Sequence, residues 1–112
     1  MAVTVTVLIP AKTAEAAQTT QYTSTGVTTI IDKFTATNYS AAAATISVNL
    51  ITVADSASND NLTVKTKTLQ AGETYTFPEV VGQVLAPGGF ISTIAGTASA
   101  VNIRASGRQV TQ

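Results

Sequence analysis

The strongest constraint on the fold is the pattern of residues 69–110, where short apolar and β-branched runs alternate with glycine turns. Turn signals stand at Ala71-Gly72 and at Pro87-Gly88-Gly89, because proline fixes φ and glycine accepts a positive φ. Threonine is the commonest residue of the chain, and β-branched side chains suit the pleated surface of a strand. These features predict an all-β protein.

The rest of the chain has the same alternation. Strands are expected at residues 3–8, 21–25, 28–38, 45–53, 62–69, 73–77, 80–85, 90–95 and 100–105. Residues 28–38 and 45–53 are expected to pair as a hairpin across a loop of small residues. At 112 residues the chain is long enough for one core, so we predict a single domain over residues 1–112. The fold class is an antiparallel β-sandwich of about seven to nine strands, jelly-roll-like or immunoglobulin-like.

The N-terminal segment, residues 1–20, is expected to form a strand followed by an extended arm. Val3, Val5 and Val7 alternate with threonine, which is the pattern of a half-buried strand. Pro10 is expected to end that strand because it cannot donate a hydrogen bond to a neighbour. The pattern leaves open whether this segment reaches across to other molecules or belongs to the sheet of its own domain.

Two later strands allow their faces to be assigned. In residues 28–38, the large residues Ile30 and Phe34 mark the inward face, and this places Asp32 inward as well, at a sheet edge or as a cap of a backbone group. In residues 45–53, Ile46, Val48 and Leu50 are expected to point inward.

Charge and reactive side chains are scarce. Six basic and six acidic residues give a formal net charge of zero, and no basic run is present, so we expect no nucleic-acid partner. No apolar run approaches the length of a membrane helix, and we expect neither a membrane partner nor an export signal. Cysteine and histidine are absent, which excludes disulfides and the common zinc ligand sets and fits folding in a reducing cytoplasm.

The same inventory argues against catalysis. Without histidine or cysteine the Ser–His and Cys–His arrangements cannot form, and the carboxylates are scattered along the chain. We therefore expect no enzyme activity, no catalytic residues, no cofactor and no small-molecule substrate. The polar loop Asp55–Asn61 contains oxygen ligands of the kind that calcium prefers, but it lacks the order and glycine of an EF-hand, so a solvated loop is favoured over an ion site.

Four cations are candidate interface residues. Arg104 and Arg108 have even spacing on the last strand and are expected on one outward face, where arginine is a common anchor of protein interfaces. An ordinary solvated face is the equal alternative. Lys65 and Lys67 are also expected to point outward, and for them the favoured interpretation is an edge strand that uses lysine to block stray pairing.

Segments of the chain resemble a family of small all-β virion proteins of tailed bacteriophages. The matching segments are a strand ending in Thr37-Asn38, the turn AGET at residues 71–74, GQVLAPGGFI at residues 82–91 and AVNIRASGRQV at residues 100–110. The resemblance extends from Ile30 onward and consists mostly of turn glycines and apolar positions.

The resemblance implies a non-enzymatic structural protein of the virion, assembled in the bacterial cytoplasm. The expected role is capsid decoration or cement, with the major capsid protein shell and copies of the chain itself as partners. The alternative within this class is a neck or tail-associated protein. A carbohydrate- or receptor-binding module of a fibre or spike ranks lower, because tryptophan is absent and most tyrosines and phenylalanines fall at core-facing positions.

Overall fold

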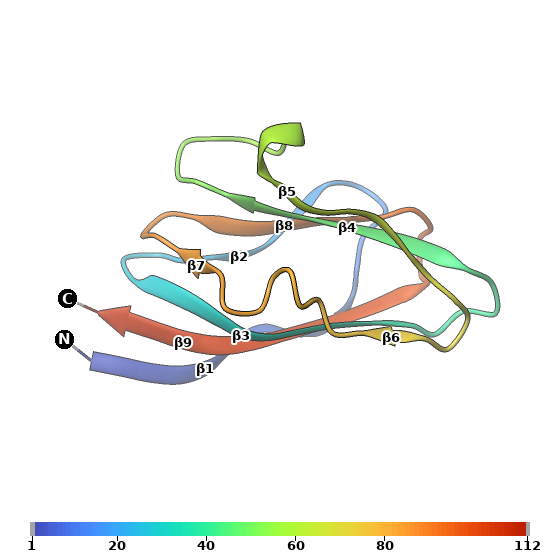
Figure 1. Ribbon diagram of the computed structural model, residues 1–112, viewed down its shortest axis with the longest axis horizontal. Coiled ribbons are helices and arrows are strands. Elements are labelled where there is room, and N and C mark those ends of the chain that lie inside the picture. Colours follow the sequence, from blue (N-terminus) through green and yellow to red (C-terminus); the bar gives the residue numbers. More distant parts are fainter. Residues whose placement is uncertain (1, 112) are drawn as a thin grey trace.

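The computed structural model describes residues 2–111 and has nine β-strands in that range, arranged in two antiparallel sheets (Figure 1). In chain order the strands are β1 (Ala2–Thr13), β2 (Thr19–Thr23), β3 (Thr28–Asn38), β4 (Ala44–Ile51), β5 (Leu62–Leu69), β6 (Thr74–Tyr75), β7 (Val84–Leu85), β8 (Phe90–Ala95) and β9 (Val101–Thr111). One short 3-10 turn, η1 (Asn59–Asn61), precedes β5. The prediction of an all-β sandwich is confirmed. Over these residues there is no helix with the length and apolar character needed to cross a membrane.

The strands pair as if one long antiparallel hairpin were folded over into two sheets. Sheet A has the order β1-β9-β3-β6, with β7 also paired to β3, and sheet B has the order β2-β8-β4-β5. Antiparallel pairs are nested around the central β4–β5 hairpin: β2 pairs with β8, β1 pairs with β9, and β3 pairs with β6 and β7. Of the two expected topologies, this nesting is the jelly roll. Figure 1 shows sheet A as the lower layer, with the start of β1 and the end of β9 side by side.

The expected hairpin between residues 28–38 and 45–53 is wrong. β3 lies in sheet A and β4 lies in sheet B, so the intervening loop is an arch between the layers. The buried side chain of Asn38 holds this arch, because its amide nitrogen donates to the carbonyls of Ala42 (2.8 Å) and Leu69 (2.9 Å). Its side-chain oxygen accepts from the backbone amide of Ser40 at 2.9 Å. Alternation along each strand identifies the strands but not the sheet that each one joins.

A β-bulge in β3 corrects the expected position of Asp32. The register with β9 shifts between Ile31 and Lys33, so the inward series passes from the buried Ile31 to the buried Phe34. Asp32 is exposed and Ile30 lies half-buried on the outer face, contrary to the prediction that both point inward. An extra residue in one strand reverses the faces of the residues beyond it, and here it removes the need to bury a carboxylate.

The core lies between the sheets, and Phe77 is one of its two buried aromatic side chains. Phe77 and Phe34 are fully buried and meet edge to face with their ring centroids 4.7 Å apart. Phe77 comes from the turn that separates β6 from β7, so the two strands expected at residues 73–77 and 80–85 are reduced to two residues each. Val80, in that same turn, is also fully buried. Two buried side chains thus fix an irregular turn against the core.

β1 continues past the proline that was expected to end it. Its register with β9 shifts between Val7 and Ile9 and again between Ile9 and Lys12, and Pro10 lies within this irregular stretch of an edge strand. Proline is tolerated there because no ladder hydrogen bond is required of it. The segment 1–20 is therefore mainly a strand of the domain's own sheet, β1. Residue 1 of this segment lies outside the described range.

Candidate functional site

The most distinctive surface is the outer face of sheet A, where side chains from four strands form one row. Val5 of β1 is opposite Arg108 of β9, Arg108 is opposite Ile30 of β3, and Ile30 is opposite Val84 of β7. Directly opposed residues of antiparallel strands point to the same side of a sheet. Arg108 therefore lies between aliphatic neighbours on both sides.

Further aliphatic residues extend this row into a band. We define the outer band as Val3, Val5, Val7, Ile30, Val84 and Val110. Val5 is 79% exposed and Val84 is 58% exposed, whereas large aliphatic side chains in a small domain are usually covered. Grouped exposed apolar side chains are typical of protein–protein contact surfaces.

The centre of the outer band is an ion pair between Arg108 and Asp32. The Nη2 and Nε atoms of Arg108 donate to the Asp32 carboxylate at 2.9 and 3.0 Å, in a fork-like geometry. This hydrogen bonding, reinforced by the opposite charge of Asp32, raises the pKa of Arg108 above its ordinary value. Both side chains remain about two-fifths exposed, at 44% and 40%. The guanidinium is thus fixed in orientation while its outer surface stays accessible to a partner.

Arg104 is on the same outer face, as the sequence predicted for the two arginines. It is exposed and lies opposite Thr35 of β3. Among residues 2–111 it takes part in no ion pair, unlike Arg108. Four residues along a strand separate the two arginines by about 13 Å, so they mark two points on the face and not one shared site.

The two lysines of β5 lie at the edge of sheet B but differ in orientation. A register shift between β4 and β5 places Val64 opposite Val48 and Lys67 opposite the buried Ile46. Lys65 is exposed as predicted. Lys67 is half-buried and opposite a core residue, so it lies on the inner side of β5, contrary to the prediction that it points outward. As with Asp32, a bulge breaks the even spacing from which the face was inferred.

Lys67 is instead part of a small surface cluster with Tyr75 and Glu79. Its ammonium nitrogen lies 4.6 Å from the centroid of the Tyr75 ring, a cation–π distance. The Tyr75 hydroxyl donates to the Glu79 carboxylate at 2.6 Å, which lowers the pKa of Glu79 and raises the pKa of Tyr75. These contacts fasten the turn after β6 to the edge of β5.

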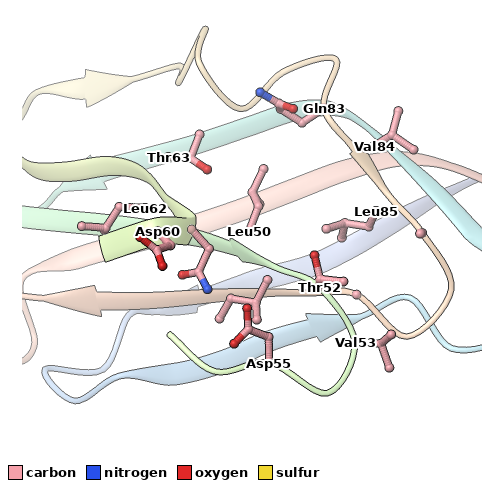
Figure 2. Close-up of a pocket in the computed structure, with 14 residues that line it drawn as sticks. Leu50, Thr52, Val53, Asp55, Asp60, Leu62, Thr63, Gln83, Val84 and Leu85 are labelled. Atoms are coloured by element: carbon pink, nitrogen blue, oxygen red, sulfur yellow. The ribbon is translucent and has the colours of Figure 1, made fainter. Parts of the chain in front are cut away.

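A groove of 480 Å³ opens between the sheets at the end where β7 faces β4 and β5 (Figure 2). Leu50 and Leu85 contribute apolar surface, and Asp55 and Asp60 line it as well (Figure 2). No cationic side chain is among its described lining residues. The described polar lining of the groove is therefore neutral or acidic.

The loop Asp55–Asn61, which borders this groove, is held by hydrogen bonds within the loop and to β4. The Asn61 side-chain oxygen accepts from Asn49 at 2.7 Å and from the backbone amide of Ser58 at 3.1 Å, so that oxygen is already used. Across residues 2–111 no three histidine, cysteine, aspartate or glutamate residues are grouped to hold a metal ion.

The outer band is not evident from the sequence pattern alone. The alternation of Val3, Val5 and Val7 predicts a half-buried face, but all three side chains are exposed, because they point to the outer face of sheet A. Absence of charge over residues 2–11 was the available signal, since an exposed edge strand normally carries lysine or another charge.

Comparisons with protein-family models, curated proteins and solved structures found no match to this chain.

Proposed function

We propose that this chain is a non-enzymatic structural protein of a phage virion, which binds the outer surface of the capsid shell as a decoration or cement protein. The observation that carries the proposal is the outer band, with the oriented guanidinium of Arg108 at its centre. Aliphatic surface supplies the favourable free energy of docking, and an arginine at the middle supplies directional hydrogen bonds.

The physical character of the chain supports a structural role. Zero net charge leaves little electrostatic repulsion between copies of the protein. Many identical weak contacts, repeated by the symmetry of a shell, hold such a protein without any single tight interface. The capsid as partner is supported by the sequence resemblance from Ile30 onward.

A neck or tail-associated position is the alternative within the same class, and it uses the same docking surface. A carbohydrate- or receptor-binding module has less support. Tyr22 is half-buried and its hydroxyl is hydrogen-bonded to Thr29 and Gln109, so its ring is not a free stacking platform. Tyr39 is 53% exposed and is the better of the two for stacking on a sugar.

The test is electron microscopy of phage particles produced from a genome that carries this gene, with and without a lysine in the outer band. Wild-type protein is expected on the capsid faces in symmetric copies, and Val84→Lys is expected to reduce its occupancy. The matched control is Val53→Lys, because Val53 is 56% exposed, close to the 58% of Val84, and lies outside the band.

Particles that contain no copies of the protein would overturn the virion role. Copies confined to the neck or tail would replace capsid decoration with the alternative. Equal occupancy of the two lysine variants would show that the outer band is not the docking surface.

A further inference from the structure

The free edge of β1 is long and is uncharged over its first seven described residues. β1 is the end strand of sheet A, so one side of its backbone has no partner strand within the described domain. Residues 2–8 contain no charged residue and no proline, and the first register shift comes only after Val7. Unpaired backbone donors and acceptors along such an edge are a template for another strand.

The other edges of the two sheets are protected. β6 and β7, at the far side of sheet A, have two residues each. β5 carries Lys65 and a bulge in which Thr66 adopts a φ of 49°, and β2 has five residues interrupted by a register shift. Short length, lysine and bulges are the usual means of blocking edge-to-edge pairing. Over residues 2–7, β1 is neither short nor bulged and carries no lysine, so its free edge is unprotected against pairing with another strand.

The sequence of this edge is palindromic, so that two antiparallel copies of it place like residues opposite each other. Residues 3–7 read Val-Thr-Val-Thr-Val, the same in both directions. If two copies pair antiparallel about Val5, valine faces valine and threonine faces threonine along the whole stretch. Such cross-strand pairs are favourable, and a two-fold interface requires a surface that complements itself.

We propose that β1 pairs antiparallel with β1 of a second copy, with Val5 opposite Val5, and joins the two A sheets into one. The two-fold axis of such a pair is perpendicular to the sheet, so the same face stays outward in both copies. Val3, Val5 and Val7 of each copy then adjoin those of the other, and the two outer bands become one continuous apolar surface. The proposal concerns the free protein and does not depend on which surface the outer band meets.

The first test is the oligomeric state of purified protein by sedimentation velocity over a concentration series. Wild type is expected to be a dimer, and Val5→Lys is expected to be a monomer because two like charges would face each other at the centre of the pair. The control is Val84→Lys, the same substitution on the same outer face but at the side of sheet A opposite β1, which is expected to stay dimeric. Circular dichroism checks that each variant keeps its strands, as expected for side chains that are 79% and 58% exposed.

The second test fixes the register through disulfide formation in a chain that has no cysteine of its own. Opposed residues have Cα atoms about 4.5–5.5 Å apart, within the range a disulfide can bridge. Val5→Cys is therefore expected to cross-link to itself on mild oxidation. Val3→Cys is expected not to, because its two copies would lie about 13 Å apart, but it should cross-link to Val7→Cys in a mixture of the two variants.

A wild-type protein that stays monomeric at all concentrations would overturn the proposal. So would a dimer that survives Val5→Lys, or one that Val84→Lys disrupts, since contact would then be through another surface. Self-cross-linking of Val3→Cys in place of Val5→Cys would overturn the register. Because these measurements use no phage particle, their result is separate from the result for capsid binding.

Discussion

Replacing Gly107 with alanine tests the close approach between β9 and the bulge of β3. Gly107 lies in the middle of β9 and does not have the left-handed φ that favours glycine. A β-carbon built there would lie 2.1 Å from the carbonyl oxygen of Ile30 and 3.2 Å from the backbone nitrogen of Asp32. Both atoms belong to the backbone, so relief requires the strands to separate and not merely a side chain to rotate.

The sign of the change in the free energy of unfolding shows whether the added β-carbon of Gly107→Ala meets open space or the backbone of β3. With open space, alanine would stabilise the strand by about 0.5–1 kcal/mol, because glycine is the more flexible residue in the unfolded chain. Overpacking of a core costs about 1–3 kcal/mol, and an overlap with backbone belongs at the upper end of that range. The expected net loss for Gly107→Ala is about 2 kcal/mol.

Urea denaturation followed by far-ultraviolet circular dichroism measures this loss. With a denaturant slope of about 2 kcal/mol/M, the midpoint should fall by about 1 M. Gly26→Ala is the control: Gly26 has a φ of +70° and no atom within 4 Å of the added carbon, so only backbone strain of about 1–2 kcal/mol applies. A Gly107→Ala variant as stable as wild type, or more stable, would refute the close approach.

Three further substitutions are expected to lower the stability of the fold for three different physical reasons. Asn38→Ala should cost about 1–3 kcal/mol in the same urea assay, because it leaves the buried carbonyl of Leu69 without its donor; an unchanged midpoint would contradict that role. Phe77→Ala should cost about 3–5 kcal/mol by loss of a fully buried ring, and a smaller loss would mean that the turn collapses to fill the space. Tyr75→Phe keeps the ring but removes the hydroxyl that lowers the pKa of Glu79. A lowered carboxyl pKa stabilises the fold above the ordinary value of 4.5, and this contribution is lost as the pH falls through the folded pKa. The difference in melting temperature between wild type and Tyr75→Phe should therefore become smaller as the pH is lowered from about 7 to about 3. A difference that does not change with pH would exclude the Tyr75–Glu79 hydrogen bond as its source.

Alternation and turn residues predicted most of the strands. The expected ranges 28–38, 62–69 and 90–95 coincide with β3, β5 and β8, where apolar periodicity is bounded by clear turns. Which strands pair with each other was harder to predict from the sequence. The strands of the expected hairpin lie in different sheets. A loop of small residues permits both a tight turn and an arch between layers, so the loop alone does not distinguish the two. Local sequence does not encode that choice, which is made by the core and by the buried amide of Asn38.

The candidate site was predictable only where no bulge intervenes. Arg104 and Arg108 follow a regular stretch of β9, and their shared outward face was assigned correctly from spacing. Asp32 lies within a bulge and Lys67 follows one, and the faces expected for both from even spacing are wrong for that reason. The outer band needed strand order as well, since neighbours such as Val5 and Ile30 come from distant parts of the chain.

The nested strand pairing also sets an order of events during synthesis. β1 leaves the ribosome before the other strands of this domain, and its partner β9 emerges roughly 90 residues later. At about 5–20 residues per second, β1 waits for about 5–20 s with both edges open, while the β4–β5 hairpin can close at once. The outermost pair must therefore close late, and an interruption of translation before β9 would release a chain whose most adhesive strand has nothing to pair with but other chains.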